Sequence, residues 1–345
     1  MWNLNFRTDP KILINKVISG KDLNELEAKR LMNQIAARNI THRQIKEFLT
    51  ALQIKGATVD EITGFARALR RNSIKVNASS YPLVDVCGTG GDNTNTFNIS
   101  TAAAFIAAGA GVKIAKHGSV AISSKCGSAD VLKELGVKIN LTPAQVAYCI
   151  DQVGIGFLFA PLFHPVLKFV APDRARIGTR TVFNLLGPLI NPANVTRQVI
   201  GVYDPKLVFP IGQVLKNLRI KRAFVVHGAG CLDEISTLGE TEVADLNFGI
   251  VTHYKIVPES FGIKRNNISE ILGGSPKENA LIIKICLDPR LPSTHRDIAL
   301  INAAAAIVVS GLAVNLNKGL NLAKESVYSG NARSTLEELI YFSNL

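Results

Sequence analysis

A glycine loop between an apolar run and a helical pattern strongly limits the fold of this chain. The apolar run covers residues 81–87, and the loop reads Gly88-Thr89-Gly90-Gly91-Asp92. The helical pattern covers residues 100–108, and a second apolar run follows at 112–115. Two strands that enclose a helix form a βαβ unit, which requires a parallel sheet with helices on its faces. Further strand-like runs extend the predicted sheet of this α/β protein at residues 199–202, 223–227 and 250–254.

The first 72 residues show helical patterns throughout. A helix often begins with a capping box, in which Ser, Thr, Asp or Asn is followed three positions later by Glu or Gln. This spacing occurs at Asp22 with Glu25, at Thr41 with Gln44 and at Thr58 with Glu61. Apolar residues recur at helical spacing behind each of these starts, so we predict a small N-terminal helical domain.

The composition bounds the class of protein. The chain of 345 residues is 47% hydrophobic, which is enough to bury a large core. Its start has no apolar segment of the kind found in secretion signals, and its five cysteines form no CxxC pair. Residues 298–317 carry no charge, but they are rich in alanine and interrupted by Ser310-Gly311, so they read as a buried helix. We expect a cytoplasmic protein with reduced thiols and no membrane partner.

The formal net charge of the chain is +12 at pH 7. This charge favours an anionic partner, either a nucleic acid or a small anionic substrate, although it also fits simple solubility. The six histidines form no HxxxH or HExxH pattern, so we predict no zinc site.

The glycine loop and the helix after it form a first predicted phosphate cradle. Glycines let the backbone approach a ligand, and the amides of the loop and of the helix N-terminus point toward an anion. Asn98 adds a polar group here, while Ser100 and Thr101 also stand where a helix cap would be. The GxGxxG spacing of a dinucleotide site is absent, and the second apolar run ends in Lys116-His117-Gly118-Ser119 without an acidic residue. We expect Lys116 to point into the same crevice.

A second cradle follows at Ser123-Ser124-Lys125-Cys126-Gly127-Ser128-Ala129-Asp130, before a predicted helix at residues 131–135. Either loop alone fits an ordinary turn rich in Gly and Ser. Both loops together, with Lys116 between them, predict a ligand with more than one phosphate group.

Two adjacent carboxylates, Asp233 and Glu234, follow the apolar run 223–227 and a glycine turn. A charged pair in a loop is usually a solvated surface feature or a helix cap. Beside a polyphosphate site, however, Mg²⁺ is typically held by one or two carboxylates together with substrate phosphates. We therefore predict that this pair binds Mg²⁺.

Basic residues cluster after His164, at Lys168, Arg174, Arg176 and Arg180. Arginine forms paired hydrogen bonds with a carboxylate or a phosphate, so we expect at least one arginine to meet a substrate. The remaining members fit a basic surface helix.

Taken together, these segments closely resemble the anthranilate phosphoribosyltransferase family, and the resemblance covers nearly the whole chain. The matching motifs are Asp85-Val86-Cys87-Gly88-Thr89-Gly90-Gly91-Asp92, Asn98-Ile99-Ser100-Thr101, Lys116-His117-Gly118, Ser128-Ala129-Asp130, Ala171-Pro172-Asp173-Arg174, residues 183–192, and Leu232-Asp233-Glu234-Ile235-Ser236. The family implies an α/β fold of the nucleoside phosphorylase/phosphoribosyltransferase type, in which a small N-terminal helical domain precedes a larger α/β domain with a mainly parallel sheet. We expect the helical domain at residues 1–72, with a helical contribution from about 166–190, and the domain that binds phosphoribosyl pyrophosphate at 73–345.

The resemblance also implies a reaction and a site. Phosphoribose passes from phosphoribosyl pyrophosphate to the amine of anthranilate, which gives N-(5-phosphoribosyl)anthranilate and pyrophosphate in tryptophan biosynthesis. The implied cofactor is Mg²⁺, held by Ser100, Asp233 and Glu234, and the implied assembly is a homodimer formed through the helical domain. The residues implied for phosphoribosyl pyrophosphate are Gly88, Gly90, Gly91, Asp92, Thr96, Asn98, Ser100, Thr101, Lys116, Ser119 and Ser128. Those implied for anthranilate are Gly88, His117, Ser119 and Arg174, and the implied catalytic residues are Lys116 and His117.

Two departures from the family pattern stand out. The family usually reads Lys-His-Gly-Asn-Arg, whereas Ser119 and Val120 take the last two places here, which bears on acceptor affinity and identity. Cys231 stands where a glycine is common, so we expect the loop before Asp233 to differ slightly.

Two other interpretations compete with this one. A pyrimidine nucleoside phosphorylase-like enzyme would not need the acidic pair. A non-catalytic nucleic-acid-binding relative would have degraded both the glycine loop and the acidic pair, and both are intact, so we do not expect a nucleic-acid partner.

Overall fold

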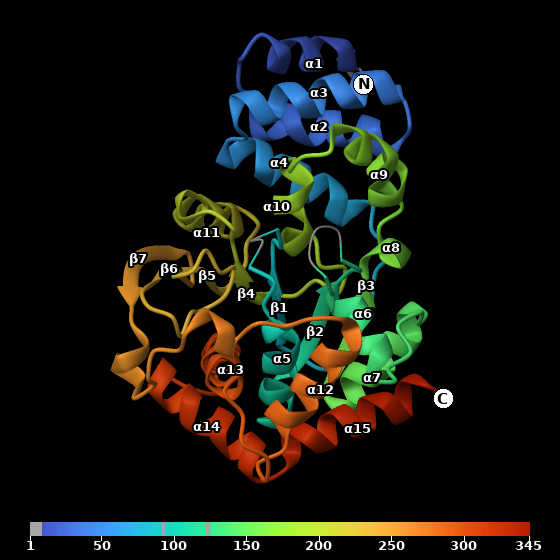
Figure 1. Ribbon diagram of the computed structural model, residues 1–345. Helices are drawn as coiled ribbons and strands as arrows, with labels where there is room; N and C mark the ends of the chain where they lie inside the picture. The colour runs from blue at the N-terminus through green and yellow to red at the C-terminus, as the bar shows by residue number, and fades with distance from the viewer. Residues whose placement is uncertain (1–8, 92–93, 122–124) are drawn as a thin grey trace. The chain divides into compact units, whose positions relative to one another are not determined.

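The computed structural model describes residues 9–91, 94–121 and 125–345, which divide into two compact units (Figure 1). The helical unit consists of the chain up to Ser73 together with His164–Ile190. The α/β unit consists of Ile74–Phe163 and Asn191–Leu345.

The helical unit packs amphipathic helices around buried apolar side chains such as Leu31, Phe48 and Phe65. Its helices are α1 (Pro10–Ile18), α2 (Glu25–Ala36), α3 (His42–Lys55), α4 (Val59–Arg71), α9 (Pro165–Ile177) and α10 (Val182–Leu189). The phenyl rings of Phe48 on α3 and Phe65 on α4 meet edge to face, with 5.8 Å between their centroids.

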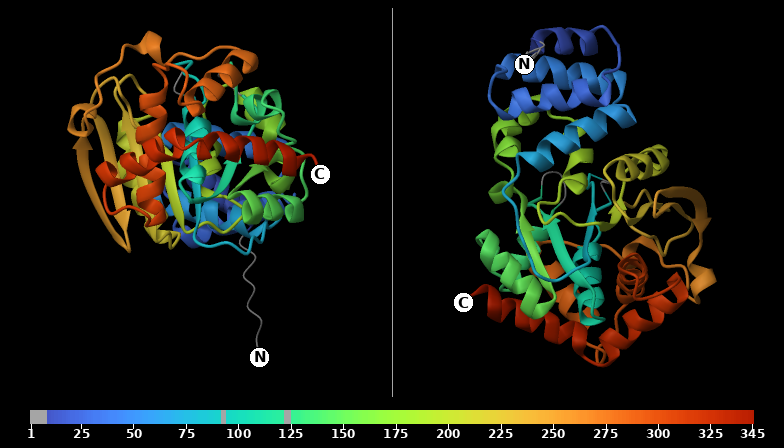
Figure 2. Two further views of the ribbon diagram at one scale, coloured as in Figure 1. Left: turned by 90° about the horizontal axis from the view of Figure 1, so that it is seen from below. Right: turned by 180° about the vertical axis from the view of Figure 1, so that it is seen from behind.

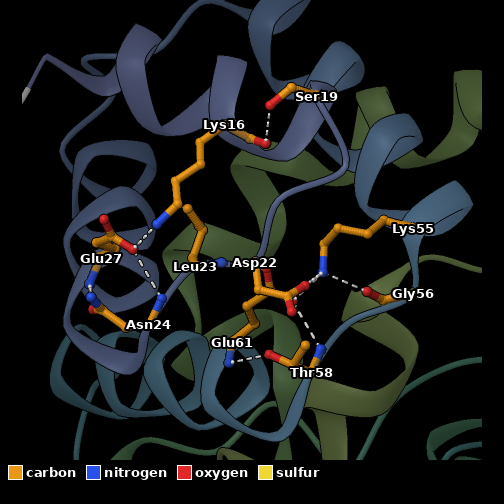
Figure 3. Close-up of polar contacts among 10 residues, drawn as sticks. All are labelled: Lys16, Ser19, Asp22, Leu23, Asn24, Glu27, Lys55, Gly56, Thr58 and Glu61. Atoms are coloured by element: carbon orange, nitrogen blue, oxygen red, sulfur yellow. Dashed lines mark hydrogen bonds and ion pairs between the residues drawn. The ribbon is translucent and has the colours of Figure 1, made fainter.

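Two of the three predicted capping boxes are confirmed, at Thr41 with Gln44 and at Thr58 with Glu61. The third prediction, Asp22 with Glu25, is wrong, because α2 is capped two residues later by Asn24 with Glu27. The Asp22 carboxylate instead accepts a hydrogen bond of 2.6 Å from Lys55 Nζ (Figure 3). The same ammonium group donates to the buried carboxylate of Glu61, at 2.9 Å.

The α/β unit is built on a seven-stranded sheet in the order β3-β2-β1-β4-β5-β6-β7 (Figure 1). Strands β1 to β5 run parallel, and β6 and β7 are antiparallel at one edge. The strands are β1 (Leu83–Gly88), β2 (Lys113–Gly118), β3 (Ile155–Phe159), β4 (Arg197–Gly201), β5 (Arg222–Gly228), β6 (Thr241–Asn247) and β7 (Ile250–Ile256). The predicted fold class, with helices at the N-terminus and a mainly parallel sheet, is confirmed.

Helices cover both faces of this sheet, and α5 and α13 pack against each other beside β1 (Figure 2). The helices of the unit are α5 (Ile99–Gly109), α6 (Ser128–Glu134), α7 (Pro143–Val153), α8 (Ala160–Phe163), α11 (Val208–Asn217), α12 (Pro276–Leu287), α13 (Arg296–Ser310), α14 (Leu316–Tyr328) and α15 (Asn331–Ser343). Short 3₁₀ turns occur at Pro205–Leu207, Pro258–Phe261 and Ile268–Glu270.

The uncharged stretch at 298–317 forms most of α13, and residues 298–309 of this helix are buried. The helix ends at Gly311, which has a φ of +90°, and α14 begins five residues later at Leu316. The predicted buried helix is confirmed for residues 298–310, whereas the rest of the stretch forms a turn and the start of α14. Within the described ranges, no helix has the length and apolar character needed to cross a membrane.

Candidate functional site

The glycine loop leaves the carboxyl end of β1 and lies against the acidic pair. Gly90 N donates a hydrogen bond of 2.7 Å to Asp233 Oδ2, 143 positions away in the sequence. A Cβ atom on Gly88 would lie only 2.1 Å from the same oxygen, so this position needs a residue without a side chain. Gly90 and Gly91 have φ angles of +65° and +75°, which glycine adopts at little cost. Two motifs that the sequence predicts separately thus form one structure.

Gly201 at the end of β4 holds the acidic loop from another side. It pairs in register with Gly88 across the sheet, and its carbonyl oxygen accepts a hydrogen bond of 2.9 Å from Thr89 N. A Cβ on Gly201 would lie 1.5 Å from the backbone oxygen of Asp233. No role was predicted for Gly201, although a glycine inside a predicted strand is a signal of close backbone approach.

The second carboxylate reaches the N-terminus of α5. Ser100 N donates a hydrogen bond of 3.1 Å to Glu234 Oε1, so a side chain from a distant loop satisfies an amide of the first helical turn. A carboxylate at this end of a helix is also favoured by the helix dipole. Asn98 occupies the cap position, and Ser100 lies inside the helix. The Thr101 hydroxyl is buried and has no hydrogen-bond partner among the residues that the structure describes.

Lys116 lies on β2 beneath the first turn of α5 and is 2% exposed. Its Nζ donates to the carbonyl oxygen of Val86 at 2.7 Å and to Ser100 Oγ at 3.3 Å. Burial lowers the pKa of Lys116, although the Cys87 thiol and three nearby carboxylates act in the opposite direction. Its hydrogen bond to Ser100 holds the ammonium group at the N-terminus of α5, where an anion is expected.

Asp85 is a buried carboxylate that supports the neighbouring strand. Its Oδ1 accepts a hydrogen bond of 3.0 Å from His117 N, and its Oδ2 accepts one of 3.5 Å from Cys87 Sγ. Burial and the charge of Asp85 raise the pKa of Cys87 well above its usual range. Asp85 was predicted only as part of a motif, yet a lone carboxylate in an apolar strand is a signal that a polar partner lies nearby.

The second cradle forms where the chain after β2 returns to α6. Asp130 Oδ2 accepts hydrogen bonds of 2.9 Å from both Ala121 N and Gly127 N. Ser128 Oγ donates to the carbonyl oxygen of Ser119 at 3.4 Å. A Cβ on Gly127 would lie 2.4 Å from Ala121 N, so glycine is needed for this close approach.

The two cradles are joined directly, because Asn98 Nδ2 donates a hydrogen bond of 3.1 Å to the carbonyl oxygen of Cys126. Thr96 forms an isolated antiparallel bridge with Leu272 on the other side of the first cradle. Three residues named in the sequence analysis lie outside the described ranges, namely Asp92, Ser123 and Ser124.

Arg174 belongs to the helical unit and is described within it. It lies on α9, with its guanidinium carbon 5.4 Å from the centroid of the Phe183 ring on α10. Its neighbour Arg176 lies 3.7 Å from Asp173, which also accepts a hydrogen bond of 2.7 Å from His42.

The donor set around the acidic pair fits Mg²⁺. Asp233, Glu234 and the hydroxyl of Ser100 offer only oxygen atoms, the ligands that Mg²⁺ prefers. Among the described residues, no group of three or more His, Cys, Asp or Glu side chains could hold a metal ion. A site with two carboxylates leaves positions for phosphate and water, which is the usual arrangement for Mg²⁺ with a phosphorylated substrate.

The turn before the acidic pair contains an unusual backbone conformation. Cys231 is exposed and has a φ of +63°, and the preceding Gly230 has a φ of +84°. A glycine would adopt the conformation of Cys231 at a lower steric cost.

Two family models match the chain. The model described as "Glycosyl transferase family, helical bundle domain" matches residues 11–73. The model described as "Glycosyl transferase family, a/b domain" matches residues 80–333.

Proteins that carry the name anthranilate phosphoribosyltransferase match nearly the full length. The protein of Moorella thermoacetica is 48% identical over 331 residues, which cover 96% of this chain and 97% of that protein. The crystal structure from Thermus thermophilus has a TM-score of 0.92 and 39% identity, and covers 96% of this chain and 99% of its own. The structure from Saccharomyces cerevisiae "in complex with PRPP and Mg" has a TM-score of 0.88 and 29% identity over 98% of both chains. The predicted resemblance is confirmed, and the chain belongs to the anthranilate phosphoribosyltransferase family.

Proposed function

We propose that the two joined cradles and the acidic pair form the site at which phosphoribosyl pyrophosphate reacts with anthranilate. The chain is a transferase of tryptophan biosynthesis, as its family membership states. The observation that supports this location best is the pair of hydrogen bonds, of 2.7 and 3.1 Å, that connects Asp233 and Glu234 to the glycine loop and to α5. It brings carboxylates, helix amides and the Lys116 ammonium group to one end of the sheet.

Phosphoribosyl pyrophosphate would bind to backbone amides at the N-termini of α5 and α6, which attract phosphate groups. The residues proposed for it are Gly88, Gly90, Gly91, Asp92, Thr96, Asn98, Ser100, Thr101, Lys116, Ser119 and Ser128. The buried ammonium group of Lys116 gives this site a positive charge that solvent screens little.

Mg²⁺ would be held by Asp233 and Glu234 with the hydroxyl of Ser100. When bound, this ion supplies positive charge that offsets the negative charge of the pyrophosphate group. Asp233 and Glu234 already accept hydrogen bonds from backbone amides, which fixes their carboxylates in place.

The reaction breaks the bond from ribose C1 to a pyrophosphate oxygen, and the electron pair leaves with pyrophosphate. The anthranilate nitrogen forms the new bond to C1 and gives up a proton. Lys116 and the loop amides stabilise the negative charge that develops on the leaving group. His117 is proposed as the proton acceptor, and Asp85 fixes its backbone through the hydrogen bond of 3.0 Å. Gly88, Ser119 and Arg174 complete the proposed anthranilate side.

A homodimer formed through the helical unit is also proposed. The helical unit exposes large apolar side chains on α1 to α3, including Ile12, Leu26 and Ile54, with exposed fractions of 60%, 54% and 83%. Apolar side chains are typical of the fully buried core of a homodimer interface. Light scattering coupled to size-exclusion chromatography checks this, because a mass of one chain would contradict it.

The test of the proposed reaction follows anthranilate fluorescence after mixing with phosphoribosyl pyrophosphate and Mg²⁺. The wild type should consume anthranilate, and Asp233→Asn/Glu234→Gln should be slower by at least about a hundredfold, since its metal carboxylates are lost. Glu240→Gln is the matched control, because this exposed carboxylate lies on the same loop and pairs with Lys255 at 2.6 Å. If the folded wild type consumes no anthranilate but cleaves a pyrimidine nucleoside with phosphate, the proposed reaction is wrong.

A further inference from the structure

A line of hydrogen bonds passes through two side-chain amides beside the first cradle. Gly274 N donates to Asn279 Oδ1 at 2.8 Å, and Asn279 Nδ2 donates to Asn98 Oδ1 at 2.9 Å. Asn98 Nδ2 then donates to the carbonyl oxygen of Cys126 at 3.1 Å. Asn279 lies on α12, is 1% exposed and stands 181 positions from Asn98 in the sequence.

The two ends of this line fix its direction. A backbone N–H only donates and a backbone carbonyl only accepts. Because Gly274 presents an N–H, Asn279 must turn its oxygen toward Gly274 and its nitrogen toward Asn98. Asn98 must then turn its own nitrogen toward Cys126. Neither amide can flip without placing two donors or two acceptors against each other, which is costly for buried groups.

Residues 271–274, here called the bracing segment, lie alongside the loop that leads into α5 and form backbone hydrogen bonds with it. Phe97 N donates to the carbonyl oxygen of Ile271 at 3.2 Å, and Gly273 N donates to that of Asn95 at 2.8 Å. A Cβ on Gly273 would lie 2.6 Å from Phe97 Cα, so the two backbones are in close contact. Asn279 therefore holds Asn98 against a backbone that is itself fixed.

We propose that Asn279 is a positioning residue that sets the spacing between the two phosphate cradles by orienting Asn98. Asn98 occupies the N-cap position of α5 in the first cradle, and Cys126 immediately precedes Gly127 and Ser128 in the second. The inference rests on the proposed function and deepens it. A ligand whose phosphate groups occupy both cradles gains from a preset spacing, whereas a ligand held by one cradle gains nothing.

Asn279→Asp tests this with almost no change in side-chain volume. Its carboxylate still accepts from Gly274 N, but it presents an oxygen to Asn98 where the wild type presents a donor. If Asn98 keeps its orientation, its Oδ1 faces the new carboxylate at position 279. If its amide flips, its Oδ1 faces the carbonyl oxygen of Cys126. The loss of about one hydrogen bond should raise KM for phosphoribosyl pyrophosphate roughly fivefold to tenfold. The kcat and the Kd of pyrophosphate with Mg²⁺ should stay within about twofold, since pyrophosphate alone does not need both cradles.

Two companions separate positioning from lost stability. Asn279→Ala removes both hydrogen bonds without placing two oxygens against each other. It should raise KM for phosphoribosyl pyrophosphate as Asn279→Asp does, and it should leave the Kd of pyrophosphate unchanged. Ile283→Val lowers stability at a fully buried position of the same helix and should leave KM unchanged.

The wild type is measured first, and failure to consume anthranilate there counts against the proposed function. With an active wild type, the positioning role is overturned if the folded Asn279 variants keep the wild-type KM. It is equally overturned if binding of phosphoribosyl pyrophosphate and of pyrophosphate weakens to the same extent.

Discussion

Replacing Gly201 by alanine should damage both the stability and the activity of the enzyme, because the new methyl group meets the backbone of the acidic loop. The added Cβ would lie 1.5 Å from the Asp233 carbonyl oxygen and 2.2 Å from its carbonyl carbon, whereas ordinary contact begins at 3.4 Å. A backbone cannot rotate away as a side chain can. Asp233 must therefore retreat by almost 2 Å, taking its carboxylate away from Gly90.

The size of the effect follows from this displacement. Overpacking of a rigid site lowers the free energy of unfolding by roughly 1–3 kcal/mol. Because the clash here is with backbone, we expect a loss of about 3 kcal/mol. A shift of about 1 Å in a positioned group lowers catalytic rates by about a hundredfold, so kcat/KM should fall by at least that factor. Gly88→Ala makes an instructive comparison, because its Cβ would meet chiefly the Asp233 carboxylate, at 2.1 Å, and would lie 3.3 Å from the backbone oxygen of Asp233. That side chain can turn away, so activity should fall with a smaller loss of stability.

Thermal unfolding and the anthranilate fluorescence assay measure both quantities. Gly201→Ala should lower Tm by about 5 °C or more. Gly187→Ala is the control, since a Cβ at this helical glycine meets nothing within 4 Å outside its chain neighbours. The following Pro188 disfavours a helical residue that carries a Cβ, so Tm should fall here, but by less than in Gly201→Ala. A Gly201→Ala enzyme with the Tm and kcat/KM of the wild type would refute the argument.

Three further predictions concern buried charge and thiol groups. Glu61→Ala should destabilise the helical unit by roughly 3 kcal/mol in urea unfolding, because it removes a fully buried carboxylate that accepts from Lys55 and two backbone amides. Burial acts to lower the pKa of Lys55, but hydrogen bonds to Asp22 and Glu61 raise it above its usual value. Lys55 therefore adds stability below its unfolded pKa of about 10.4, and this contribution is lost as pH rises through its folded pKa. Between about pH 9 and 12 the urea midpoint of Lys55→Met should therefore decline less than that of the wild type. An aromatic disulfide reagent at pH 8 should label one thiol fast, that of the exposed Cys231, and Cys231→Ser should abolish this fast phase. The other thiols are less exposed, and burial raises the pKa of Cys126 to about 11, so they should react more slowly.

The parts of the fold that follow local rules were predictable from the sequence. The glycine loop, the strand before it and the helix after it were all found, because each depends on residues next to one another. The wrong capping box shows the limit of such rules. Asp22 with Glu25 and Asn24 with Glu27 both satisfy the capping spacing, and only the tertiary ion pair between Asp22 and Lys55 decides between them.

Two strands were missed for different reasons. Ile155–Phe159 is a short apolar run that begins one residue after α7, and its apolar pattern does not separate it from that helix, so only Gly154 marks the boundary. Thr241–Asn247 alternates polar and apolar residues and is joined to β7 by Phe248-Gly249, whose φ angles are +44° and +91°. Such a turn is typical of a tight hairpin, but Phe-Gly is not one of the dipeptides that mark this turn in a sequence.

The hydrogen-bond partners of Asn279 and Asp85 could not be predicted, for another reason. Their hydrogen-bond partners are 181 and 32 positions away, and one of those partners is a backbone atom that no motif records. In contrast, Asp233 and Glu234 were identifiable because they form an adjacent acidic pair after a glycine turn.

Calorimetric titration of phosphoribosyl pyrophosphate tests most directly the claim that the acidic pair and the glycine loop form one metal-assisted phosphate site. Titrations with Mg²⁺ and with a chelator are compared for the wild type and for Asp233→Asn/Glu234→Gln. The account predicts that Mg²⁺ tightens binding to the wild type by at least about tenfold, and that the double variant gains almost nothing from the metal. A folded double variant that keeps the full gain from Mg²⁺ would contradict the account, because the metal would then be held elsewhere.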